Sequence, residues 1–247
     1  MRALADRYEI PIHSHVFKGS VSYALKKFGP ARTHHLLGRD VIFAHSNGLA
    51  EEEVRALGEA GASIAVVSYT HENILYGVCP VIELLQAGAN VTISTDGTAP
   101  YCSYDLFREV SRAMWAQWTR LGDMRLLPAG KALRMVTMDA AQALGLGHML
   151  GSLEVGKRAD IILVDADKPH LVPDLAAPRL LALYVNGNDV HTTIVDGRIL
   201  MEGRKVHTVD EGEVLALARE AAERVFSRFD IAPYLQTSND FWQGWKY

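Results

Sequence analysis

The chain has 247 residues, 49% of them hydrophobic, and a formal net charge of −4. This length allows one large domain, or a large domain with a smaller one, and a sizeable core in either case. The mild negative charge gives no electrostatic reason to expect binding to nucleic acid or to an anionic membrane, and no apolar run reaches the roughly 18 residues that a membrane-spanning helix needs.

In the first half of the chain, apolar β-prone runs alternate with segments of helical period. Strands are predicted at residues 9–15, 41–46, 63–69 and 90–96. Helices are predicted at residues 19–29, 49–61, 80–88 and 104–122. Val/Ile-rich strands that are each followed by a helix are typical of parallel βα units buried on both faces.

The spacing of these units is regular, since His15 and His45 lie 30 residues apart at the ends of successive strands. A TIM barrel has roughly 31 residues in each of its eight βα units. Four units therefore predict an α/β fold that amounts to half of a TIM barrel, over residues 1–149.

The pattern changes after a helical segment at residues 128–146. Residues 150–206 contain short strands interrupted by Gly and Asp-Gly, which indicates a hairpin-rich β element. The last predicted element, in residues 207–247, is an amphipathic helix at 210–229 that begins after Asp210 as its N-cap, followed by an aromatic tail.

The residues that could carry chemistry are His15, His45 and Asp96, because each ends a predicted parallel strand. Active sites of TIM barrels are built at that end of the strands. Imidazole nitrogen and carboxylate oxygen are ligands that zinc favours in hydrolytic sites, and a carboxylate beside a metal-bound water can accept its proton. The alternative for each residue alone is a hydrogen-bonded structural role.

Four stretches make a resemblance specific. In chain order, "IHSHVFKGS", "VIFAHSNGLAEEEV", "GVCPVIELLQAGANVTISTDG" and "GSLEVGKRADIILVDAD" resemble the C-terminal half of the amidohydrolase superfamily. The similar branch contains the cytosine, guanine and S-adenosylhomocysteine deaminases and the triazine hydrolases. The resemblance implies strands 5–8 of a (β/α)8 barrel, then part of a small β-sandwich domain, then a C-terminal helix.

The same resemblance implies roles for individual residues. It gives His15 and Asp96 as ligands of one divalent metal, with zinc expected first and iron as the alternative. His45 matches a histidine that contacts a metal or the reacting oxygen, where it would steady an oxyanion. Asp96 and His45 would be the catalytic residues, with Asp96 moving the proton. His13 would support His15.

Three further residues are expected near the substrate. His71 and Glu72 lie in the loop that follows the third strand, and a solvated loop is the alternative for both. Lys18 stands where the deaminases usually have a glutamate that contacts the heterocycle. A charged lysine cannot accept a proton, so an acidic substrate becomes conceivable.

These observations predict a cytoplasmic, metal-dependent hydrolase that acts on C–N bonds of a small molecule, of the deaminase type. The cysteines, Cys79 and Cys102, fit a reducing compartment. The strand-1 "H-x-H" motif of the family is absent, so a homo-oligomer or a missing N-terminal half is expected to complete the barrel. One alternative is a truncated paralogue that serves as a scaffold or subunit. Another is an amidase or peptidase of the same superfamily, in which Lys18 recognises a carboxylate.

Overall fold

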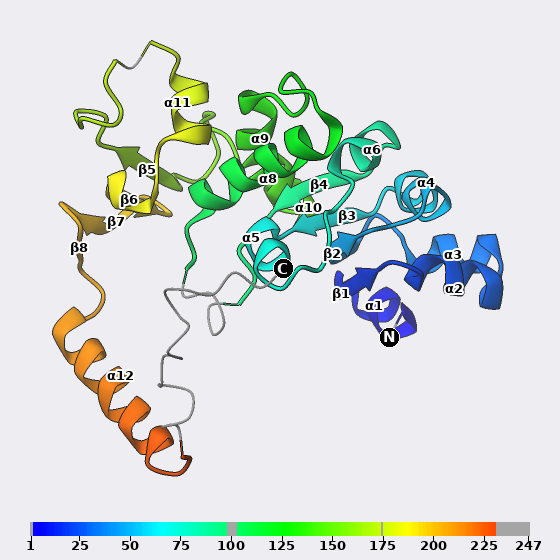
Figure 1. Ribbon diagram of the computed structural model, residues 1–247, viewed down its shortest axis with the longest axis horizontal. Helices are drawn as coiled ribbons and strands as arrows, with labels where there is room; N and C mark the ends of the chain where they lie inside the picture. Colours follow the sequence, from blue (N-terminus) through cyan, green and yellow to red (C-terminus); the bar gives the residue numbers. More distant parts are fainter. Residues whose placement is uncertain (1, 98–102, 174, 231–247) are drawn as a thin grey trace, which may run out of the picture.

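The computed structural model describes residues 2–97, 103–173 and 175–230, and its first half is built on a parallel sheet (Figure 1). Four strands lie in the order β1-β2-β3-β4, and each is parallel to its neighbour. They are β1 (Ile12–Phe17), β2 (Val41–Asn47), β3 (Ser63–Val66) and β4 (Asn90–Ile93). The four predicted strands are confirmed, although β3 ends earlier than expected because a helix begins at Ser68.

Helices connect the strands and cover the outer side of the curved sheet, as α4, α6 and the α2–α3 pair show in Figure 1. The helices of this half are α1 (Arg2–Tyr8), α2 (Ser20–Phe28), α3 (Pro30–Leu36), α4 (Glu51–Ala60), α5 (Ser68–Asn73), α6 (Val81–Gln86), α8 (Leu106–Leu121), α9 (Ala129–Met135) and α10 (Met138–Ala143). The predicted helix at 128–146 is two helices, because the backbone of Thr137 leaves the helical region at φ −125° and ψ −91°. Neither α3 nor α5 was predicted, since both are short and rich in polar residues.

The core lies between the sheet and these helices. Val41, Ile64 and Val91 of the strands and Leu57 and Leu84 of the helices are fully buried. The opposite face of the sheet borders a hollow of about 350 Å³, whose lining includes Ile42, Ala65, Thr92 and, from α10, Ala140. One face of the sheet is therefore packed, and the other is partly open.

The second half contains an antiparallel sheet in the order β5-β6-β7-β8. Its elements are β5 (Ile161–Val164), α11 (Ala177–Leu183), the 3-10 turn η1 (Gly187–Asp189), β6 (Val190–Val195), β7 (Arg198–Glu202) and β8 (Lys205–Val206). The predicted hairpin at Asp196-Gly197 is confirmed, with φ angles of 50° and 75° that fit a two-residue hairpin turn.

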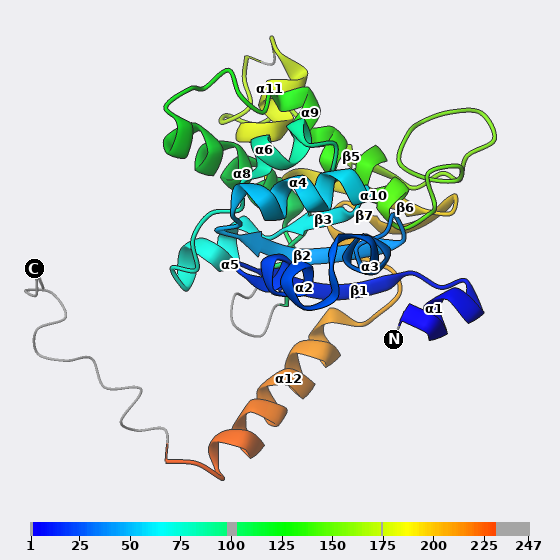
Figure 2. The same cartoon turned by 90° about the vertical axis from the view of Figure 1, so that its right-hand side faces the viewer.

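The C-terminal helix α12 (Glu211–Phe226) begins as predicted, with the Asp210 side chain accepting a hydrogen bond from the amide of Glu213 at 3.0 Å. It has no buried residue and projects from both sheets in Figures 1 and 2. The predicted tail beyond residue 230, like Cys102, lies outside the described residues. Along the described part of the chain, no helix combines the length and the apolar character needed to cross a membrane.

A single buried carboxylate holds two helix ends at the carboxyl edge of the sheet. Glu53 of α4 is 0% exposed. It accepts hydrogen bonds from the amides of Gly19, Val21 and Ser22 at the start of α2, and from Ala50 at the start of its own helix, at 3.0–3.1 Å. Burial opposes its charge, but these four donors outweigh burial and keep the pKa of Glu53 below its usual range.

Replacing Glu53 tests this double cap. Glu53→Gln should lower the free energy of unfolding at pH 7 by about 2–4 kcal/mol, because an amide replaces a charged acceptor facing four N–H groups. Because the pKa is lower in the folded state, the stabilisation is present above the ordinary glutamate range and is lost as the pH falls through the folded value. Denaturant unfolding at pH 7 and at pH 3 measures both effects. Glu51→Gln, an exposed change in the same helical turn, should stay within about 0.5 kcal/mol.

A close contact between α4 and the end of α6 requires a glycine. A Cβ built on Gly58 would clash with the carbonyl group of Ala87 and lie 2.6 Å from its Cβ. Gly130 of α9 is also helical, but a Cβ there meets nothing within 4 Å. The two glycines therefore predict opposite effects of the same substitution.

Gly58→Ala should destabilise the protein by about 1–3 kcal/mol through overpacking. Gly130→Ala should stabilise it by about 0.4–1 kcal/mol, because alanine has less backbone freedom in the unfolded chain. Thermal or chemical unfolding of both variants gives the sign of each change. Stabilisation by Gly58→Ala would contradict the close approach of α4 and α6.

Candidate active site

A backbone irregularity in β2 brings the first two histidines together. His15 pairs with Ala44 and Val16 pairs with His45, so a regular strand would put the His15 and His45 side chains on opposite faces. Instead, the register shifts after Val16, and His45 and Ser46 have left-handed φ angles of 73° and 57°. Nε2 of His45 consequently lies 3.2 Å from Nδ1 of His15. Non-glycine residues adopt this backbone rarely and at a cost in free energy.

A third imidazole extends this contact into the protein. Nε2 of His71, from α5, lies 3.0 Å from Nδ1 of His45. His45 is 8% exposed and His71 is 4% exposed, whereas His15 is exposed at the edge of the sheet. The three side chains therefore form a hydrogen-bonded row that runs from the surface into the core.

The helix that carries His71, α5, is held by a buried glutamate of α8. Glu109 of α8 is 4% exposed and accepts a hydrogen bond from the amide of Tyr69 in the first turn of α5, at 3.1 Å. Burial raises the pKa of Glu109 to about 7. Sequence reasoning did not identify Glu109, although a glutamate on the apolar face of an amphipathic helix could have indicated a buried role.

Two aromatic rings pack beside the row and were also not predicted. Phe17 stacks on His45, with ring centroids 5.1 Å apart and an interplanar angle of 17°. Tyr76 meets Phe17 edge-on at 5.3 Å. Phe17 follows His15 by two residues in the same strand, so its position on the same face could have been inferred.

Burial favours the neutral form of the two inner histidines. It lowers the pKa of His45, helped by the neighbouring His15, and it lowers the pKa of His71 to about 4, helped by His45. The negative charge of Asp96 acts in the opposite direction and raises both pKa values, because Asp96 is close enough to interact electrostatically with both rings. His15, His45 and Asp96 thus lie at the same edge of the sheet.

Asp96 shares an unusual backbone with His45. It follows β4 with a φ of 63°, is exposed, and accepts a hydrogen bond from the amide of Gly97 at 2.7 Å. Left-handed non-glycine residues cluster at functional sites, where surrounding structure holds them. Two of the candidate residues carry this feature.

The remaining candidate residues, His13, Lys18 and Glu72, are exposed at the surface. His13 is exposed, and its ring centroid lies 6.5 Å from that of His15. Lys18 is exposed just after β1, and its stem passes 3.9 Å from a Cβ built on Gly48. Glu72 forms an ion pair with Arg112 of α8, so its charge is already compensated.

The nitrogen and oxygen donor atoms at this edge are of the types that bind zinc, and one distance between them matches a zinc site. Two nitrogens that bind one zinc tetrahedrally lie about 3.4 Å apart, close to the 3.2 Å between Nδ1 of His15 and Nε2 of His45. Within residues 2–97, 103–173 and 175–230, however, no three His, Cys, Asp or Glu side chains form a complete metal cluster. The described residues therefore supply only part of a ligand set.

Among the described residues, three buried polar atoms that are close in the sequence to the row of histidines lack a hydrogen-bond partner. Ser46 Oγ, Asn47 Oδ1 and Thr70 Oγ1 are buried without a hydrogen-bond partner in the described part of the chain. They adjoin His45 and His71 in the sequence. Buried polar atoms without partners commonly mark a bound water, ion or ligand.

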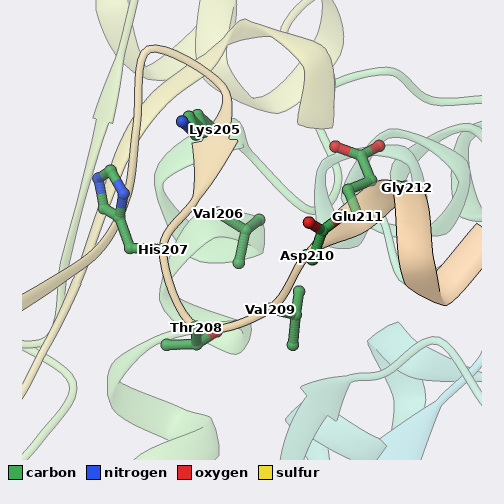
Figure 3. Close-up of a pocket in the computed structure, with 8 residues that line it drawn as sticks. All are labelled: Lys205, Val206, His207, Thr208, Val209, Asp210, Glu211 and Gly212. Atoms are coloured by element: carbon green, nitrogen blue, oxygen red, sulfur yellow. The ribbon is translucent and has the colours of Figure 1, made fainter.

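A larger hollow elsewhere is of a different kind. About 670 Å³ of space is bounded by the single segment 205–212 that links β8 to α12 (Figure 3). The side chains of this segment point in several directions in Figure 3. Because its lining comes from one segment alone, this hollow lacks the converging groups of a catalytic site.

Comparisons with known proteins identify the family to which the chain is related. The model of the amidohydrolase family matches residues 1–200. A 5'-deoxyadenosine deaminase of Methanosarcina acetivorans is 35% identical over 231 residues, which cover 91% of this chain and 53% of that protein. A 5-methylthioadenosine/S-adenosylhomocysteine deaminase of Syntrophomonas wolfei is 34% identical, covering 91% of this chain and 54% of that protein.

Comparison with solved structures also finds hydrolases that are similar to this chain. An adenosine deaminase from Xanthomonas campestris with bound zinc superposes with a TM-score of 0.84 at 28% identity, covering 92% of this chain and 53% of that one. A zinc complex of atrazine chlorohydrolase from Arthrobacter aurescens gives a TM-score of 0.79 at 25% identity, covering 89% and 50%. The fold is therefore of the TIM-barrel type. The chain spans about half the length of the relatives it matches, and it belongs to the amidohydrolase family.

Proposed function

We propose that this chain is the C-terminal half of a metal-dependent hydrolase that deaminates an adenosine-type nucleoside. The observation that carries the proposal is the contact between His15 and His45 at the carboxyl edge of a parallel sheet, with Asp96 at the same edge after β4. The deaminases named among the relatives support the reaction and the substrate class. The reaction consumes one water, replaces the exocyclic amine by oxygen and releases ammonia.

His15 and Asp96 would hold the metal, together with ligands from outside the described residues. His45 offers Nε2, the atom that faces His15, to the metal or to the reacting oxygen. A bound zinc or iron would act as a Lewis acid that makes water nucleophilic near neutral pH. Asp96 would be the group that takes a proton from the attacking water and passes it to the departing amine.

The architecture follows from the same proposal. Residues 1–149 would form strands 5–8 of the barrel, residues 150–206 the C-terminal part of the β-sandwich, and residues 207–247 the terminal helix and tail. The hollow beside Ile42, Ala65 and Thr92 supports this division, because a closed barrel would fill it with side chains of four further strands. An N-terminal half, or a second copy, would cover that face.

Two alternatives follow from particular observations. The incomplete ligand set among the described residues favours a truncated paralogue that acts as a scaffold or subunit. The charge of Lys18 at the mouth favours an amidase or peptidase that binds a substrate carboxylate. Free, buried Cys79 fits the cytoplasmic location that the main proposal assumes.

Metal analysis and one substitution test the main proposal. The whole protein should bind about one equivalent of zinc or iron and release ammonia from 5'-deoxyadenosine. Asp96→Asn should lower kcat/KM about 10³-fold or more while the protein stays folded, because the proton acceptor is lost. Asp196→Asn is the matched control, since Asp196 also has a left-handed backbone and precedes a glycine. If the parent protein shows neither bound metal nor turnover, that result would support the scaffold alternative.

Lys18 is tested through substrate preference. Lys18→Glu should shift the kcat/KM ratio of a neutral nucleoside over an analogue with a carboxylate by about tenfold or more towards the neutral substrate, which corresponds to about 1.4 kcal/mol. Lys26→Glu makes the same charge change on an exposed position of α2 and should leave the ratio unchanged. An unaltered ratio in both variants would remove Lys18 from the pocket.

A further inference from the structure

The row of three imidazoles constrains where the proton of His45 lies. Nε2 of His45 is 3.2 Å from Nδ1 of His15, and Nδ1 of His45 is 3.0 Å from Nε2 of His71. A neutral imidazole has one N–H and one lone pair. With both nitrogens in contact, His45 must donate at one end of its ring and accept at the other.

We infer that His71 is a positioning residue, which accepts the Nδ1 proton of His45 and thereby fixes the tautomer and orientation of the His45 ring. This inference rests on the proposed function, because it starts from a metal ion at His15. It assigns His71 a role behind the site, in place of the contact with substrate expected from the sequence.

Both ways of holding a metal at His15 require the same proton position on His45. If His15 uses Nε2 for the metal, its single proton stays on Nδ1 and is donated to Nε2 of His45. If Nδ1 of His15 and Nε2 of His45 hold the metal together, Nε2 of His45 again provides a lone pair. In either case the His45 proton lies on Nδ1 and is donated to His71.

The surroundings of His71 suit an acceptor that must not move. The side chain is 4% exposed, and α5 is held by the hydrogen bond from the Tyr69 amide to Glu109. A cavity of about 20 Å³ borders His71 together with Ser68 and Gln117, which is room for one water. A water there would be placed to accept the proton that His71 keeps on its other nitrogen.

One consequence concerns chemistry at the mouth. Nε2 of neutral His45 offers one lone pair, which accepts the His15 proton in the first arrangement and binds the metal in the second. It cannot donate a hydrogen bond to an oxyanion unless the ring has first taken up a proton. The inference therefore replaces the expected oxyanion donor with an acceptor whose direction His71 sets.

The test reads the tautomer directly. Long-range ¹H–¹⁵N correlation spectra of the whole protein, labelled at histidine and saturated with zinc, should show His45 with a protonated Nδ1 and an unprotonated Nε2. Zinc affinity, from competition with a chelating dye, should fall about 10–100-fold in His71→Phe, which offers no acceptor. His71→Gln should recover most of that loss, because its amide oxygen can accept the Nδ1 proton.

His207→Phe is the matched control, since His207 is exposed in the segment after β8, and it should change neither readout. Zinc that binds while His45 carries its proton on Nε2, or an unaltered zinc affinity in His71→Phe, would overturn the inference and leave the proposed function standing. If neither zinc nor iron alters the His15 signals of the unmodified protein, the proposed function fails and the inference fails with it.

Discussion

The left-handed backbone at His45 and Ser46 is the constraint on which the candidate site depends. Neighbouring parallel strands present alternate residues to opposite faces, so His15 and His45 could not meet in a regular pair. The extra residue in β2 turns the His45 ring across the edge of the sheet and brings it within hydrogen-bond distance of both His15 and His71. The free-energy cost of this conformation must be met by the packing around it, including the Phe17 ring that stacks on His45.

Two buried glutamates hold the helices next to the candidate site in place. Glu53 holds the start of α2, just after the strand that carries His15, and Glu109 holds the start of α5, which carries His71. In both cases a carboxylate from one helix accepts hydrogen bonds from backbone amides at the start of another helix, which have no partner within that helix. The segments that follow β1 and β3 are thereby fixed by buried hydrogen bonds.

The sequence predicts the repeating part of this structure better than its exceptions. Val/Ile-rich runs gave the four parallel strands, and the end positions of His15, His45 and Asp96 placed them at one edge of the sheet. Periodicity gave no sign of the bulge at Ser46, since the choice of a left-handed backbone comes from tertiary packing. The same limit applies to α5: its residues were expected in a strand and a loop, whereas they form a helix whose start is held by the tertiary contact with Glu109.

Under the proposed function, metal binding and assembly of the barrel are coupled. Among the described residues, His15 and His45 are in contact and Asp96 lies at the same edge of the sheet, but no three side chains form a metal-binding group, so further ligands would come from the strands that close the sheet. An ion bound by both halves stabilises their contact in proportion to its affinity, because it binds the assembled state and not the separate parts. The same closure would exclude water from the hollow beside Ile42 and Ala65. Residues that hold the metal would thus also hold the fold together, and the strained backbone at His45 would be supported from both sides once the barrel is complete.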